Sequence, residues 1–236
     1  MSFSLVGRML ANRVGVAPKP VLNGPLSSIP GPLQKARAGG VIDLSAAEAS
    51  FITAEASNVL IGRPPSLRAT VVAQGRILDG EFTIHRFYLG SQSEDGPTRF
   101  LQVITQHDQI IDGEIKLFSK LAEITPGSAD EWDLWLTGSE EQPPLLTGPS
   151  IRWQGTFEFN RVWSPGPQRV DAKEYEETIH SGADDHQVTC WTMLFSRALT
   201  PSFPEWLQLA TCQAGSERWI EAYVGISIEA GEVSSI

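Results

Sequence analysis

Cysteine is scarce in this chain, and long apolar runs are missing from it. The 236 residues contain only two cysteines, Cys190 and Cys212, which are too few for a disulfide framework in a chain of this length. No run of about 18 apolar residues occurs, so the sequence predicts no transmembrane helix. The beginning of the chain also lacks the apolar stretch of about 7–15 residues that a secretory signal needs. Together these absences predict a cytoplasmic protein.

Common catalytic motifs are absent as well. The chain has no Gly-rich phosphate-binding motif, no H-E-x-x-H metal motif and no G-x-S-x-G nucleophile motif. This disfavours the commonest nucleotide-binding, zinc-peptidase and serine-hydrolase classes. The sequence therefore predicts no cofactor and no bound metal, and it favours a non-catalytic protein.

Acidic residues are absent from the first 40 residues, although the chain as a whole has a net charge of −10. Residues 1–40 are rich in proline and glycine and carry a charge of +5, whereas residues 41–236 carry −15. An acidic body repels phosphate backbones, so we expect no binding to nucleic acid. The pattern predicts a basic N-terminal arm over residues 1–40 and a single acidic globular domain over residues 41–236.

The arm begins with an amphipathic segment. Residues 3–10 place their apolar side chains on one helical arc with Arg8 facing away, and Arg13 falls back inside the arc. A helix this short is marginal in water, so packing on its own domain is one interpretation. The other is docking to a protein partner or to an anionic membrane surface. The residues predicted to make that contact are Phe3, Leu5, Val6, Arg8, Leu10 and Arg13.

From about residue 67 the pattern is that of β-strands, with turns at Asp79-Gly80 and Asp112-Gly113. Residues 164–187 are polar and mixed and predict no strand. Ser128 and Glu131 form a capping-box pattern that opens a short helix, and another short helix is expected over residues 46–51. The fold class is therefore α+β, mainly β, with a few short helices. The predicted strands are 67–78, 82–89, 99–105, 115–124, 152–163, 188–198, 205–212 and 218–228.

A similarity at a spacing of 106 residues suggests an internal repeat, since Phe82–Thr105 lies on Val188–Thr211 without a gap. Two similar antiparallel β-meander units would follow, over about residues 41–138 and 150–230. The cleft between such units could bind a small ligand. The other interpretation is that amphipathic meanders resemble one another in any case. If the repeat is real, the equivalent strand positions Leu101, Val103, Leu207 and Leu209 are expected in the core.

The candidate site residues are His180, Asp185, His186 and Cys190. A thiol enzyme needs a base within hydrogen-bonding reach of the cysteine, and zinc needs about three or four converging ligands. Positions four apart on a strand share a face but lie about 13 Å apart, so an acidic loop beside a buried thiol is the alternative. If Cys190 and Cys212 lie on neighbouring strands with matching faces, they either form a disulfide or pack as small hydrophobic residues.

Three segments carry a resemblance to a known family. They are I-K-L-F-S-K-L-A-E-I-T-P at 115–126, E-W-D-L-W-L at 131–136 and R-W-I-E-A-Y-V-G-I at 218–226. The chain from about residue 40 onward resembles a family of bacterial proteins of unknown function typified by YjfK. The resemblance implies a cytoplasmic bacterial protein encoded near a membrane-stress protein of the phage-shock type, and it transfers no site residues.

We therefore expect a non-catalytic interaction or accessory protein linked to bacterial envelope stress. One alternative is a small-ligand-binding protein that uses the cleft between the units. The other is a metal or thiol enzyme that uses His186 and Cys190.

Overall fold

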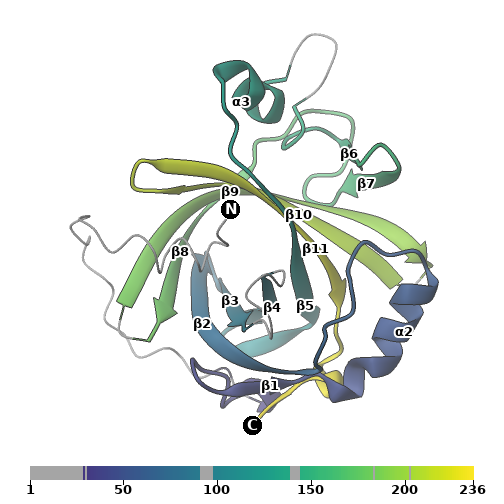
Figure 1. The fold of residues 1–236 in the computed structure, drawn as a ribbon, viewed down its shortest axis with the longest axis vertical. Helices are drawn as coiled ribbons and strands as arrows, with labels where there is room; N and C mark the ends of the chain where they lie inside the picture. Colours follow the sequence, from purple (N-terminus) through teal and green to yellow (C-terminus); the bar gives the residue numbers. More distant parts are fainter. Residues whose placement is uncertain (1–28, 30, 91–97, 139–143, 183, 202) are drawn as a thin grey trace.

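An eight-stranded antiparallel barrel forms the centre of the computed structural model, seen end-on in Figure 1. The structure describes residues 29, 31–90, 98–138, 144–182, 184–201 and 203–236. The mainly β prediction is confirmed. Each strand pairs with the next in the order given, and the last returns to the first. The barrel strands are β2 (Arg68–Asp79), β3 (Phe82–Leu89), β4 (Arg99–Gln106), β5 (Gln109–Ile124), β11 (Glu217–Ser227), β10 (Phe203–Ala214), β9 (Asp184–Thr200) and β8 (Lys173–Ser181).

Shorter elements cover the outside of the barrel on two sides (Figure 1). One cover consists of η1 (Gly31–Leu33), β1 (Val41–Asp43), η2 (Ser45–Ala47), α2 (Glu48–Ala56), η3 (Ala230–Glu232) and β12 (Ser234–Ser235). The other consists of α3 (Ala129–Leu136), β6 (Ser150–Trp153) and β7 (Phe157–Arg161). Ile29 and Leu33 are buried in the first cover, so the end of the predicted basic arm packs on the barrel. None of the helices in the described ranges is long and apolar enough to cross a membrane.

Strands β4, β10 and β11 are buried on both faces over most of their length, because one face points into the barrel and the other lies under a cover. Leu101 and Val103 pack against the first cover, and Leu207 and Leu209 pack against the second. All four are fully buried, as predicted, but they lie outside the barrel wall. The inward face carries a separate cluster that includes Tyr88, Phe100, Phe118, Cys190, Cys212 and Tyr223.

The hairpin turns follow from local backbone chemistry. Asp79 pairs with Phe82 around a two-residue loop in which Gly80 has a φ of 61°, so the predicted turn there is confirmed. The turn predicted at Asp112-Gly113 is wrong, because β5 runs through it. The chain turns instead at His107-Asp108, where both residues have the positive φ that a type I′ hairpin needs. Gly113 lies where the register of β4 and β5 shifts.

Two other segments differ from their predictions. Residues 152–163 are not one strand, because Gln154 and Gly155 both have positive φ and turn the chain between β6 and β7. Residues 164–187 contain the barrel strand β8, which the polar composition concealed: a carboxylate, Glu177, occupies one of its inward positions. The capped helix is confirmed, since the Ser128 side chain accepts from the Glu131 backbone N–H.

The predicted duplication is not shown by the structure. Two three-stranded meanders are present, β3–β4–β5 and β9–β10–β11, and they join edge to edge through β5 and β11. Their registers differ, because Phe87 lies opposite Leu101 whereas its proposed counterpart Met193 lies opposite Leu209. A gapless repeat would place Met193 opposite Leu207. Both meanders belong to one closed barrel.

Candidate functional site

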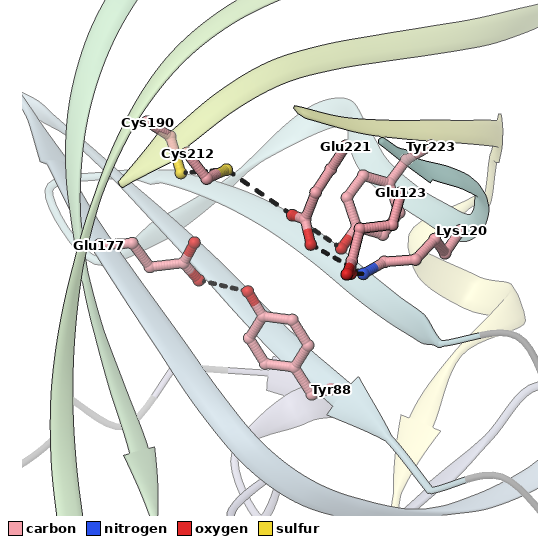
Figure 2. A network of polar contacts seen from close by, with 8 residues as sticks. All are labelled: Tyr88, Lys120, Glu123, Glu177, Cys190, Cys212, Glu221 and Tyr223. Carbon is pink, nitrogen blue, oxygen red and sulfur yellow. Dashed lines mark hydrogen bonds and ion pairs between the residues drawn. The ribbon is translucent and has the colours of Figure 1, made fainter. Parts of the chain in front are cut away.

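Charged side chains lie inside the barrel among aromatic rings (Figure 2). Arg86 on β3 and Glu177 on β8 form one group, and Lys120 on β5 and Glu221 on β11 belong to another. Burying an ionised group is costly unless it is paired and hydrogen-bonded. The partners of each charge therefore decide what the barrel interior can do.

Glu177 is the centre of the first group. Its Oε2 accepts from Arg86 Nη1 at 2.7 Å, and its Oε1 accepts from the Tyr88 hydroxyl at 2.8 Å. Arg86 also donates to Gln102 and lies over the Phe100 ring, 5.0 Å from the centroid. Desolvation is the largest influence on Arg86 and opposes its charge, but the Glu177 carboxylate and three weaker neighbours together outweigh it and raise the pKa of the guanidinium. Burial raises the pKa of Tyr88, so its hydroxyl stays protonated and donates.

The space for this carboxylate comes from Gly75 on β2, the strand that pairs with β8. A Cβ atom at Gly75 would lie only 1.8 Å from Glu177 Oε1. Ile179 lies opposite Gly75 in the register, and Glu177 lies opposite Ile77, two residues along. The place of the Glu177 carboxylate inside the barrel thus depends on a residue without a side chain at position 75.

Glu221 is the centre of the second group. Its Oε1 accepts from Lys120 Nζ at 2.7 Å, and its Oε2 accepts from the Tyr223 hydroxyl at 3.1 Å and from Cys212 Sγ at 3.7 Å. Lys120 also donates to Glu123 at 2.7 Å. Desolvation lowers the pKa of Lys120, but the two carboxylates outweigh it and raise that pKa overall. Burial, followed by the Glu221 charge, raises the pKa of Tyr223.

The two cysteines adjoin the second group. Cys190 on β9 and Cys212 on β10 lie directly opposite each other, and their sulfur atoms are 2.9 Å apart. Both are free thiols and both are buried, with 4% and 0% of their surface exposed. Burial raises the pKa of Cys212 well above its usual range, and Cys190 and the Glu221 carboxylate add to this. The cysteines therefore lie on neighbouring strands with matching faces.

The candidate residues from the sequence are only partly brought together. His180 Nδ1 lies 2.5 Å from Asp185 Oδ1 across the β8–β9 hairpin, where both side chains are partly exposed. His186 lies on β9, four residues before Cys190, so the strand separates the two by about 13 Å. Within the described ranges, no group of three or more His, Cys, Asp or Glu residues could hold a metal. The six arm residues Phe3 to Arg13 lie outside the described residues.

Sequence reasoning missed the charged residues of the interior. The available signal was a charge at an alternating position within an apolar strand, as with Glu221 in I-E-A-Y-V and Lys120 in L-F-S-K-L. Such a charge is either an inward residue of a barrel or an outward residue on a solvated face. The alternation alone does not distinguish these cases, because its period of two is the same in both.

His85 on β3 gives a prediction for the dependence of stability on pH. Its Nε2 lies 3.1 Å from Thr105 Oγ1, and burial, helped by the charge of Arg76, lowers its pKa from 6.5 to about 4. The unfolded chain binds a proton at His85 more readily than the folded chain does. The contribution of His85 to the free energy of unfolding is therefore complete above pH 6.5 and is lost as the pH falls towards 4. We expect a loss of about 2 kcal/mol between pH 7 and pH 5.

The measurement is urea unfolding of the wild type and of His85→Gln at both pH values. The glutamine variant should lose less stability than the wild type between pH 7 and pH 5, by about 2 kcal/mol. Equal losses in the two proteins would show that His85 titrates normally in the folded state.

One family model matches residues 20–234, which is nearly the whole chain, and its family is described as Protein of unknown function (DUF2491). No curated protein and no solved structure matches the chain.

Proposed function

Since the chain belongs to this family of proteins of unknown function, we propose from its own geometry that it is a non-catalytic interaction protein. In this proposal the barrel is a stable body, and the basic N-terminal arm makes contact with the partner. The observation that carries the proposal is that the charged side chains inside the barrel bond to one another.

The interior favours a structural use of these charges. Glu177 accepts two hydrogen bonds and Glu221 accepts three, all from side chains of the barrel itself. The rings of Phe100, Phe118 and Tyr223 pack together between the two groups. An eight-stranded barrel is just wide enough for side chains to fill it. Recognition is therefore assigned to the outside of the molecule and to the arm.

The charge of the arm supports an anionic surface as its target. Each Lys or Arg near an anionic membrane contributes about 1 kcal/mol of attraction, while the acidic body is repelled and stays away. The YjfK-like resemblance supports a cytoplasmic role in bacterial envelope stress, with a protein partner at the membrane. The apolar arc from Phe3 to Leu10 would add insertion to the electrostatic attraction.

Liposome co-sedimentation tests this proposal. Full-length protein is expected to sediment with phosphatidylglycerol vesicles and to stay in solution with phosphatidylcholine vesicles. The variant Arg8→Glu/Arg13→Glu should bind the anionic vesicles at least about tenfold more weakly than the wild type does. Residues 15–236 alone should not bind them.

Arg152→Glu is the matched control, because Arg152 is an exposed cation on the body with 66% of its side chain accessible. It should bind like the wild type. Full-length protein that ignores anionic vesicles, or an arm variant that binds as the control does, would contradict the proposal for the membrane.

A further inference from the structure

The facing thiols of Cys190 and Cys212 have the geometry that a disulfide requires. Residues directly opposite in antiparallel strands have Cα atoms about 4.5–5.5 Å apart, which falls inside the range of about 4.4–6.8 Å seen in disulfides. The two residues are opposite in the register of β9 and β10, and their sulfur atoms are 2.9 Å apart. Closing to a bond of about 2.05 Å needs a movement of about 1 Å.

The separation of the sulfur atoms is shorter than ordinary packing gives. Non-bonded carbon atoms settle about 3.5–4.0 Å apart and sulfur is a larger atom, so two thiols that acted only as hydrophobic residues would lie further from each other. Both side chains point into the same space inside the barrel (Figure 2). The pair therefore differs from two isolated buried cysteines.

We propose that Cys190 and Cys212 form a reversible disulfide when the protein meets hydrogen peroxide, which makes the pair a redox-modification site that links β9 to β10. This site is independent of the proposed contact of the arm with a membrane. Cytoplasmic disulfides are usually transient and redox-sensing, so a reversible bond suits the compartment in which we place the protein.

The order of the reaction follows from the surroundings of the two thiols. Burial and the Glu221 carboxylate keep the pKa of Cys212 high, so this thiol stays protonated. Cys190 is also the more exposed of the two, at 4% against 0%. Peroxide is therefore attacked first by Cys190, and Cys212 is the thiol that resolves the product.

Each step balances. The sulfur of Cys190 attacks one peroxide oxygen, the O–O bond breaks, and the thiol proton leaves with the other oxygen as water. The sulfur of the resulting sulfenic acid is then attacked by the Cys212 sulfur, and its hydroxyl leaves with the Cys212 proton as a second water. Glu221 Oε2 lies 3.7 Å from Cys212 Sγ and accepts its hydrogen bond, so it can take up this proton and pass it to the leaving hydroxyl. Two thiols are oxidised to one disulfide, and one peroxide is reduced to two waters.

The test is intact-mass spectrometry of the purified full-length protein after treatment with hydrogen peroxide, followed by alkylation in denaturant. We expect a monomer that has lost about 2 Da and takes up no alkylating reagent, and dithiothreitol should restore both thiols. The midpoint of thermal unfolding should rise by about 5 °C on oxidation, because the bond constrains the unfolded chain.

Cys190→Ser and Cys212→Ser separate this outcome from general oxidation. Neither variant can lose 2 Da as a monomer, and Cys212→Ser should accumulate the sulfenic acid of Cys190, a gain of about 16 Da. If a serine variant does not fold, the wild-type masses decide alone. Two alkylatable thiols after peroxide, a disulfide-linked dimer, or separate oxidation of each cysteine to sulfinic acid would overturn the proposal.

Discussion

Replacing Glu177 by alanine is expected to lower the free energy of unfolding by about 3–5 kcal/mol. The change leaves Arg86 buried inside the barrel without a counter-charge, and it removes the acceptor of the Tyr88 hydroxyl. Breaking a buried ion pair costs more than the pair contributes, because one charge stays out of water unpaired. The loss can be measured by urea unfolding followed through tryptophan fluorescence.

Glu158→Ala is the matched control for this prediction. Glu158 also faces an arginine, Arg152, but both side chains are more than half exposed and their charged atoms are 3.6 Å apart. Exposed pairs contribute about 0.2–1 kcal/mol, so this variant should unfold almost as the wild type does. A Glu177→Ala protein that is no less stable than Glu158→Ala would show that water or another group compensates Arg86.

Gly75→Ala is expected to destabilise the protein by about 3 kcal/mol, although it adds a single methyl group. That methyl would lie 1.8 Å from Glu177 Oε1 and 3.2 Å from the Tyr88 ring. The carboxylate has to move, and its bonds to Arg86 and Tyr88 are lost with the movement. The cost is therefore similar in kind to removing Glu177, and the same unfolding measurement applies.

A double-mutant cycle distinguishes this cause from general crowding. Once Glu177→Ala has removed the carboxylate, adding Gly75→Ala should cost much less than it does in the wild type, because only Tyr88 remains close. Gly62→Ala is the control, since a Cβ there meets nothing within 4 Å, and it should change stability by less than about 1 kcal/mol. Additive losses at 75 and 177 would mean that the methyl clashes with something other than the carboxylate.

The buried charges also help to specify the register of the barrel. A shift of one residue turns every side chain of a strand to the other face. Such a shift in β8 would turn the Glu177 side chain away from both Arg86 and Tyr88. A strand with only apolar side chains could change register at a smaller cost. Buried ion pairs are weak evidence for stability, but a pair that only one register satisfies opposes the alternatives.

The sequence by itself determined the elements whose signals are local. The bounds of β3 were predicted without error, and those of β4 and β10 to within two residues, because each is a short apolar-rich run bounded by turn or loop residues. Helix α3 followed from its Ser128 cap, and the Gly80 hairpin from the backbone freedom of glycine. The burial of Leu101, Val103, Leu207 and Leu209 was expected from the apolar faces of the two proposed meander units, and all four are buried although the duplication itself is not shown.

Only the tertiary structure decided how these elements close and what they enclose. Glu177 in β8 looks like one more surface charge until Arg86, 91 residues away, donates a hydrogen bond to it inside the barrel, and Lys120 meets Glu221 across 101 residues. The facing of Cys190 and Cys212 likewise depends on the register of β9 and β10. The physical reason is that alternation says which residues share a face of a strand. Whether that face meets water, a cover or the barrel interior depends on strands that are distant in the chain.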